Sequence, residues 1–186
     1  MKFLIDPGHG GHDSGAVGPG GNHESEIALA VSLMIAGHLG HNAEHECHLT
    51  RYSDIFVELD DRCEIANNWA DIFISIHCNA AEAAQASGFE VWTSPGWTPA
   101  DPIATSIWQE FKQDFPYMRA RLDTSSDGDP DKESKFRVLV GTTMPAVLVE
   151  LGFISNPEEE KRLLSPVFQT DASNAIARVL QGVANG

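Results

Sequence analysis

Three apolar segments of this chain each run directly into a side chain that can bind a metal or exchange a proton. Residues 2–6 lead to His9, residues 72–76 lead to His77, and residues 146–149 lead to Glu150. The carboxyl ends of parallel strands form the edge of an open α/β sheet, and ligands bind at that edge. We therefore expect these segments to be strands of one sheet and their polar side chains to form one site.

The rest of the sequence alternates between strand and helix patterns, which predicts an α/β fold with a mostly parallel, twisted sheet and helices on both faces. The predicted strands are residues 2–6, 46–50, 72–76, 89–93 and 146–151. The predicted helices are residues 24–38, 57–69, 101–115, 158–164 and 167–183. Between them lie a glycine-rich loop, residues 8–21, and a polar loop, residues 124–131 with the sequence TSSDGDPD. No linker or repeat is visible, so a single domain spanning residues 1–186 is expected.

Acidic residues strongly outnumber basic residues. The chain has 12 Lys and Arg against 27 Asp and Glu, a net charge of −15 at pH 7. This charge repels nucleic acid phosphates and anionic membranes, so neither is an expected partner. No apolar run approaches the roughly 20 residues that span a bilayer, and the run at residues 3–5 is too short for a signal peptide. Cys47, Cys63 and Cys78 are too few and too scattered for a disulfide framework.

The neighbouring sequence gives weaker evidence for a role in this site for His9 than for His77. Glycines flank His9 and permit unusual backbone angles, which lets the imidazole turn towards a metal or a substrate. A glycine-histidine-glycine turn is weak evidence by itself. His77 ends a segment that reads as a strand buried on both faces, so its side chain is expected at the edge of the sheet.

Two glutamates complete the candidate site, and each has a simpler explanation. Glu24 stands at the predicted start of a helix, where the helix dipole favours an acid without any further role. Glu150 interrupts an apolar strand, and burying an unpaired carboxylate is costly. It therefore needs a cationic partner, a metal-bound water or a raised pKa, and a structural ion pair with an arginine is the alternative to a catalytic role.

Several segments together resemble a known family. They are residues 6–15 (DPGHGGHDSG), Glu24, residues 49–51 (LTR), residues 75–80 (SIHCNA) and residues 144–156 (MPAVLVELGFISN). Their order and separations are similar to those of the zinc-dependent N-acetylmuramoyl-L-alanine amidases of the type 3 class, which are cell-wall hydrolases of bacteria and their phages. The resemblance runs from about residue 2 to the final helix.

The resemblance implies a role for each residue of the candidate site. It places His9, Glu24 and His77 on a zinc ion and makes Glu150 the catalytic acid and base. Two histidines, one carboxylate and an open fourth position form a known catalytic zinc arrangement. The implied substrate is peptidoglycan, cleaved at the amide between N-acetylmuramic acid and L-alanine of the stem peptide. A different zinc peptidase or amidohydrolase, or a non-catalytic wall-binding relative, remains the alternative.

Other conspicuous residues are not expected at this site. The cluster His38, His41, His45, Cys47 and His48 imitates a second metal site. The resemblance divides it between a helix end, a turn and a strand, which separates the directions of the side chains. His12, His23 and Glu26 do not match family ligands.

Two arginines and three tryptophans are also conspicuous. Arg51 and Arg62 are expected to pair with local acids. Trp92, Trp97 and Trp108 are candidates for a glycan or peptide groove, with at least one of them in the core.

The resemblance also bears on the biological setting. Residues 94–143 are close to the length found in members that lack an extra helical insertion over the zinc, so an accessible site is expected. No separate wall-binding domain is visible. A monomer is expected that acts on the cell wall or periplasm, either as a phage or prophage endolysin released from the host cytoplasm or as a processed domain of a secreted autolysin.

Overall fold

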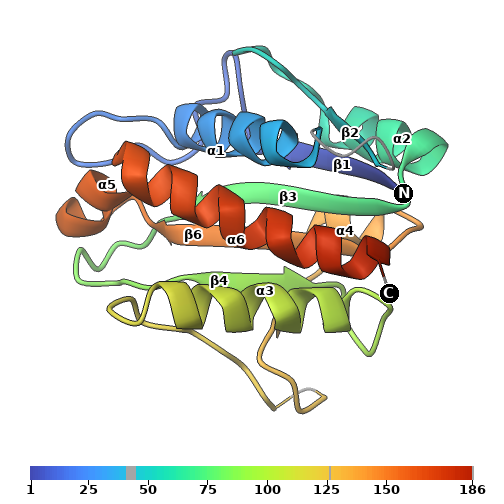
Figure 1. Ribbon diagram of the computed structural model, residues 1–186. Helices are drawn as coiled ribbons and strands as arrows, with labels where there is room; N and C mark the ends of the chain where they lie inside the picture. Colours follow the sequence, from blue (N-terminus) through green and yellow to red (C-terminus); the bar gives the residue numbers. More distant parts are fainter. Residues whose placement is uncertain (41–44, 126, 186) are drawn as a thin grey trace.

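A computed structural model describes residues 1–40, 45–125 and 127–185 (Figure 1). One six-stranded sheet forms its centre, in the order β2-β1-β3-β6-β4-β5. The strands are β1 (Lys2–Pro7), β2 (Glu46–Leu49), β3 (Ile72–Asn79), β4 (Glu90–Thr93), β5 (Lys132–Glu133) and β6 (Ala146–Phe153). Strands β2, β1, β3 and β6 are parallel, whereas β4 is antiparallel to β6 and parallel to β5. The predicted α/β fold with a mostly parallel sheet is confirmed.

Helices cover both faces of this sheet. They are α1 (Glu24–Leu39), α2 (Leu59–Trp69), α3 (Asp101–Asp114), α4 (Arg137–Val140), α5 (Pro157–Leu163) and α6 (Pro166–Asn185). In Figure 1, α1, α6 and α3 lie in front of the sheet, while α2 and the short α4 lie behind it. Among the described residues, no helix has the length and apolar character needed to cross a membrane.

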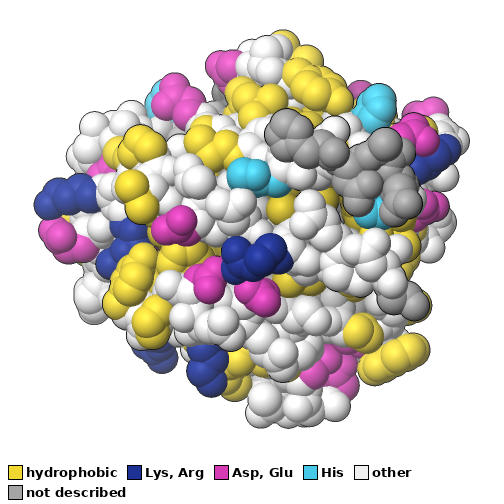
Figure 2. All heavy atoms as spheres, in the orientation of Figure 1, with side chains coloured by type: hydrophobic (Ala, Val, Ile, Leu, Met, Phe, Trp, Pro, Cys, Tyr) yellow, Lys and Arg dark blue, Asp and Glu magenta, His cyan; other side chains and the backbone are white. Residues whose placement is uncertain are grey.

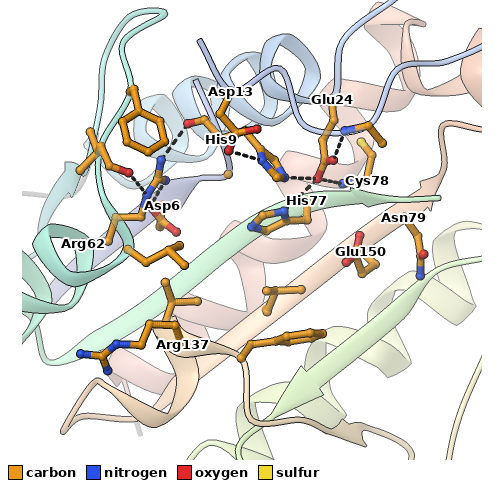
Figure 3. Close-up of a pocket in the computed structure, with 18 of the residues that line it drawn as sticks. Asp6, His9, Asp13, Glu24, Arg62, His77, Cys78, Asn79, Arg137 and Glu150 are labelled. Carbon is orange, nitrogen blue, oxygen red and sulfur yellow. Dashed lines mark hydrogen bonds and ion pairs between the residues drawn. The ribbon is translucent and has the colours of Figure 1, made fainter. Parts of the chain in front are cut away.

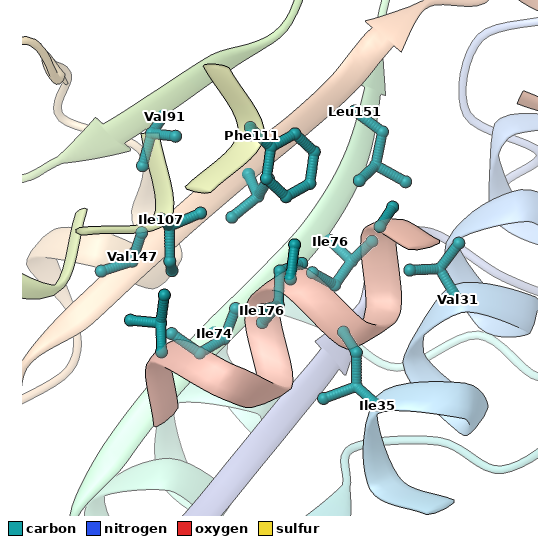
Figure 4. Close-up of a cluster of buried hydrophobic side chains, with 14 of the residues drawn as sticks. Val31, Ile35, Ile74, Ile76, Val91, Ile107, Phe111, Val147, Leu151 and Ile176 are labelled. Atoms are coloured by element: carbon teal, nitrogen blue, oxygen red, sulfur yellow. The ribbon is translucent and has the colours of Figure 1, made fainter. Parts of the chain in front are cut away.

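The larger part of the core lies between the sheet and helices α1, α3 and α6 (Figure 4). Alternate residues of β3 and β6, including Ile74, Ile76 and Val147, point to this side and are fully buried. Ile176 of α6 enters the same cluster. Burial of each such aliphatic side chain contributes roughly 1.5–3 kcal/mol, which fixes the register of the central strands.

The opposite face of the central strands has a smaller apolar cluster. Leu4, Phe73 and Leu148 pack there against Cys63 of α2 and Leu139 of α4. Side chains two or four positions apart on a strand point to the same face of the sheet. Glu150 therefore lies on the same face as Leu148, and His77 lies on the same face as Phe73. The fold thus directs Glu150 and His77 to the less covered face.

Polar contacts join the helices on the outer side of the larger cluster. Figure 2 shows this side of the molecule, on which basic and acidic side chains lie next to one another among apolar and uncharged groups. Arg178 of α6 pairs with Glu110 of α3 at 2.8 Å and also with Asp114. These pairs join α6 to the last turn of α3.

The structure corrects some predicted boundaries. The second helix begins at Leu59 rather than residue 57, and the last strand continues to Phe153. Strand β5 and helix α4 were not predicted. They contain two and four residues, too few to show a periodic pattern.

Candidate metal centre and active site

His9 is held in an unusual backbone conformation directly after β1. Its φ is +60°, a positive value that no other described non-glycine residue adopts. Such a conformation is strained for a residue with a side chain and persists only where the surroundings enforce it. Here Arg62 donates to the carbonyl oxygen of His9 at 2.8 Å and to that of Pro7 at 2.7 Å. Arg51 donates to the carbonyl of Gly8 at 2.8 Å.

His77 lies on β3 beside the turn that carries His9. In the parallel register of β3 and β6, His77 is paired with Glu150. Gly8 passes so close to the imidazole that a Cβ atom built on it would lie 2.3 Å from Cε1 of His77. A glycine is therefore required at this point for the two segments to approach each other.

Glu24 connects both histidines from the first residue of α1. Its Oε1 lies 2.8 Å from Nδ1 of His77 and 3.2 Å from Nε2 of His9. The same oxygen accepts a hydrogen bond from the Cys78 amide at 3.0 Å, and Oε2 accepts one from the Ala16 amide at 2.9 Å. The carboxylate is buried and fixed by backbone donors, which exceeds what a helix-dipole role alone requires.

His9, Glu24 and His77 therefore form one compact cluster (Figure 3). A ligand atom from each residue lies within 4.8 Å of the others, and the two imidazole centroids are 5.0 Å apart. Burial by itself would lower the pKa of both histidines, but the adjacent Glu24 carboxylate outweighs it. The net effect of burial and of Glu24 is that the pKa of His9 is raised to about 9 and the pKa of His77 is also raised. The two imidazoles in turn hold the pKa of Glu24 well below its usual range, against the effect of burial. The cluster is thus built to stabilise positive charge.

Asp13 adds a partner to the outer nitrogen of His9. Its Oδ2 lies 2.8 Å from Nδ1 of His9, while Nε2 faces Glu24. Histidines that bind metals commonly donate their second ring N–H to a carboxylate, which fixes the tautomer and the ring orientation. Asp13 belongs to the segment DPGHGGHDSG, but sequence reasoning gave it no role, because nothing in the spacing places its carboxylate against the ring.

Glu150 lies next to the cluster on β6 without belonging to it. Its Oε2 is buried and has no hydrogen-bond partner in the described structure. Burial raises the pKa of Glu150 to about 7, a change that the nearby His77 opposes and that Glu24 and Glu90 reinforce. Among the described residues, no arginine forms an ion pair with Glu150, so the structural alternative to a catalytic role lacks its partner. A carboxyl group with such a pKa can both accept and donate a proton near neutral pH.

A cavity of about 510 Å³ opens beside these groups. His9, Glu24, His77 and Glu150 line one end, and Arg137 lies at another part of the wall. The remaining wall is largely apolar and includes Phe56, Val57, Leu59, Phe136 and Leu148. The cavity can therefore hold an uncharged portion of a ligand next to ionisable groups.

The donor set of the cluster fits a catalytic zinc ion. Two imidazole nitrogens and one carboxylate leave a fourth position free in tetrahedral coordination, as in known catalytic zinc sites. The cavity and Glu150 lie beside these three residues. The predicted residues His9, Glu24, His77 and Glu150 are thus brought together, whereas His12 and His23 are not part of the cluster.

The other histidines point in separate directions. His38 hydrogen-bonds to Ser173 of α6 at 3.2 Å, and His48 packs against Trp69 at 4.5 Å between ring centroids. His45 packs edge-on against Phe3. His41 lies outside the described residues. Within the described chain, these histidines and Cys47 do not meet in a metal-binding group.

The structure shows the contacts of Arg51 and Arg62 and the burial of the tryptophans. The prediction that Arg62 pairs with an acid is confirmed by its contact with Asp6 at 2.6 Å. The same prediction was wrong for Arg51, which instead donates to backbone carbonyls, including that of Pro7. Trp108 is buried in the core as expected for at least one tryptophan, whereas Trp97 is 73% exposed.

Comparison with known proteins agrees with this geometry. The family described as N-acetylmuramoyl-L-alanine amidase, Amidase_3, matches residues 3–182. The chain belongs to this family. It is 35% identical over 189 residues to the sporulation-specific N-acetylmuramoyl-L-alanine amidase of Bacillus subtilis, covering 100% of this chain and 66% of that protein. It is 34% identical over 182 residues to the endolysin of Bacillus phage SPP1, covering 97% of this chain and 65% of the endolysin.

A solved structure shows the same fold. The catalytic domain of CwlV, an N-acetylmuramoyl-L-alanine amidase from Bacillus (Paenibacillus) polymyxa var. colistinus, superposes with a TM-score of 0.88 at 32% identity. The match covers 99% of this chain and 98% of that domain. This amidase chain thus corresponds to nearly all of a catalytic domain, while it spans about two thirds of the length of the two relatives above.

Proposed function

We propose that this chain is a zinc-dependent peptidoglycan amidase that cleaves the amide between the lactyl group of N-acetylmuramic acid and L-alanine of the stem peptide. The observation that carries the proposal is the convergence of His9, Glu24 and His77 beside the unpaired Glu150, at one end of a cavity. Membership of the amidase family supplies the substrate and the bond.

His9, Glu24 and His77 would hold the metal. Zinc bound there supplies Lewis-acid chemistry, because it polarises a carbonyl oxygen and lowers the pKa of water to about 7. Asp13 fixes the ring of His9, and the amide of Cys78 fixes the carboxylate of Glu24. These contacts orient the ligands before the metal arrives, which favours one coordination geometry.

Glu150 carries the proton transfers. In its ionised form it accepts a proton from the attacking water, and in its protonated form it passes that proton to the leaving nitrogen of L-alanine. Its pKa of about 7 keeps both forms accessible near neutral pH. The apolar part of the cavity wall beside it can position uncharged parts of the substrate.

Digestion of purified peptidoglycan tests the proposed bond. The amidase reaction releases peptides that begin with a free L-alanine amino group and leaves glycan strands intact. Amino-terminal labelling and mass spectrometry of the products identify that end. A different new amino terminus would favour the alternative of another zinc peptidase, and new reducing sugar ends would indicate cleavage of the glycan.

Zinc content and turnover measured together test the ligands. Replacement of His9 or His77 by alanine removes one of only three protein ligands, so zinc and activity should be lost together. Glu24→Gln should also weaken zinc binding, because an amide is a poorer ligand than a carboxylate. Glu26→Gln is the matched control, since this exposed neighbour in the same helical turn does not join the cluster.

The variants also separate the amidase from a non-catalytic relative. A protein that only binds the wall would retain that binding when zinc is lost and would show no turnover at any zinc content. An ordinary rate in His77→Ala with full zinc occupancy would refute the ligand assignment.

The expected setting follows from the same function. We propose that the chain acts as a monomer on the cell wall, as an endolysin or as the catalytic domain of an autolysin. The relatives named as a phage endolysin and as a sporulation-specific amidase represent these two settings.

A further inference from the structure

A second group of carboxylates lies away from the proposed zinc centre. Asp101 begins α3, and Asp127 and Asp129 belong to the polar loop that precedes β5. A carboxylate oxygen from each of the three lies within 4.8 Å of the others. Strand β4 is antiparallel to β6, so its end at Thr93, next to this loop, lies at the opposite edge of the sheet from Glu150.

Asp131 adds a buried oxygen without a partner. The residue is only 3% exposed, and its Oδ2 accepts a hydrogen bond from Thr93 Oγ1 at 2.7 Å. Its Oδ1 is buried and has no hydrogen-bond partner in the described structure, and the same holds for Oδ1 of Asp129. The carboxyl groups of Asp129 and Asp131 lie against each other. The two carboxyl groups can satisfy each other only by sharing a proton, and when both are ionised no described residue donates to either Oδ1.

The surroundings leave the negative charge of this group uncompensated. Burial, followed by the neighbouring Asp129 and Asp101 charges, raises the pKa of Asp131 to about 7, although Thr93 opposes the change. Lys132 follows directly in sequence, but its ammonium group contacts Glu90 at 3.1 Å. Within the described residues, no basic side chain forms an ion pair with Asp101, Asp127, Asp129 or Asp131.

We propose that Asp101, Asp127, Asp129 and Asp131 form a binding site for a calcium ion, separate from the zinc centre. All four side chains offer only oxygen atoms, which a hard divalent cation prefers and which do not favour zinc over it. Asp101 accepts hydrogen bonds from the amide and hydroxyl of Thr98, and its oxygens retain further lone pairs for a cation.

A cation at this position would join three parts of the fold. Asp101 belongs to α3, and Asp131 is bonded to Thr93 at the end of β4. Asp127 and Asp129 lie between them in the loop that returns towards β5. In Figure 1 this loop hangs below α3 and connects it to the edge of the sheet. The expected effect is on stability and not on the chemistry at Glu150.

Calorimetric titration of the zinc-loaded chain of residues 1–186 with CaCl2 tests the site directly. We expect saturable binding of one calcium ion, with a Kd between about 10⁻⁷ and 10⁻³ M, the range of sensor and extracellular calcium sites. Calcium should also raise the melting temperature. Asp127→Asn and Asp129→Asn should each weaken binding at least tenfold, while zinc content and peptidoglycan digestion stay unchanged.

Asp123→Asn is the matched control. Asp123 lies in the same segment, is half-buried, and accepts hydrogen bonds from the amide and hydroxyl of Ser125; it does not belong to the carboxylate group formed by the described residues. The control should bind calcium as the unmodified chain does. Absence of saturable calcium binding to the unmodified chain, or equal affinity in Asp127→Asn, would overturn the proposal. The unmodified chain needs no substitution to be tested, so the result does not depend on how a variant folds.

Discussion

Gly8 shows how a single residue shapes the proposed metal centre. A Cβ atom at this position would lie 2.3–2.6 Å from three ring atoms of His77. Gly8 does not have a positive φ, so alanine is compatible with its backbone and the contact alone decides the outcome. We expect Gly8→Ala to displace the His77 ring and to weaken zinc binding at least tenfold, as measured by competition with a zinc-chelating dye.

Gly37 provides the control for this substitution. It lies within α1, and a Cβ atom there would meet nothing within 4 Å. Gly37→Ala should therefore leave zinc affinity unchanged and stabilise the helix by roughly 0.5–1 kcal/mol. Unaltered zinc affinity in Gly8→Ala would show that the ring can move aside without loss of coordination.

Glu150→Gln separates the chemistry of the carboxyl group from its place in the fold. Loss of positioned proton transfer should lower the rate roughly 10²-fold or more, with zinc content unchanged. A structural ion-pair partner would behave differently, because breaking a buried pair costs about 3–5 kcal/mol of stability. Turnover, zinc content and thermal melting of one preparation distinguish the two, and ordinary turnover would exclude the catalytic role.

The same variant gives a test by pH. Burial raises the pKa of Glu150 from 4.5 to about 7, so the folded chain retains a proton that the unfolded chain releases over this interval. The raised pKa therefore makes Glu150 increasingly unfavourable for folding between about pH 5 and 7. Relative to the metal-free parent, metal-free Glu150→Gln should gain stability from pH 5 to pH 8, by at most about 3 kcal/mol. Urea unfolding at both pH values measures the difference.

The sequence predicts the residues of this centre to different extents. His77 and Glu150 are recognisable because each directly follows an apolar run typical of a buried strand, and the carboxyl ends of neighbouring parallel strands meet. Glu24 was predicted only through the family resemblance, since an acid at a helix start has an ordinary explanation. The contacts of Arg51 were predicted wrongly, because the backbone carbonyls that it binds become neighbours only when β1, β2 and α1 are packed together.

At the scale of elements, α5 holds together the end of β6 and the segment that precedes β4. Its residue Glu159 is buried and accepts a hydrogen bond from the Phe153 amide at 2.7 Å and from the Gly88 amide at 3.0 Å. Glu159→Ala would leave both buried donors unsatisfied, so we expect a loss of about 2–3 kcal/mol of stability in urea unfolding. Glu158→Ala, which removes an exposed partner of Lys161, should have little effect.

A smaller loss in Glu159→Ala would mean that water replaces the carboxylate at those amides.

The elements also differ in how well the sequence predicts them. The ten predicted segments were found because buried faces impose a pattern on them, whereas β5 exists only through its pairing with β4. Pairing with a strand about 40 residues earlier leaves no pattern in a two-residue segment such as Lys132 and Glu133.

At the scale of the whole molecule, a metal that binds only the folded chain must stabilise it. At a free zinc concentration of about 100 times Kd, this linkage contributes about 2.7 kcal/mol. Removal of zinc with phenanthroline, which has little affinity for calcium, should then lower the melting temperature by roughly 5–10 °C. His77→Ala should show no such change, and an unchanged melting temperature in the parent chain would contradict zinc binding at this centre.

The arrangement of the layers also predicts that the chain is active alone. Helix α3 packs against α6 and β4 and contributes no residue to the cavity, whereas Arg137 and Val138 of α4 form part of the cavity wall beside the centre. The side chains of His9 and His77 remain 26% and 18% exposed, which leaves them open to a substrate. We expect the purified, zinc-loaded chain to digest peptidoglycan without an activating protein, and limited proteolysis to bring no gain in rate. Activity that appeared only after cleavage or after addition of a second protein would show that the centre is covered in solution.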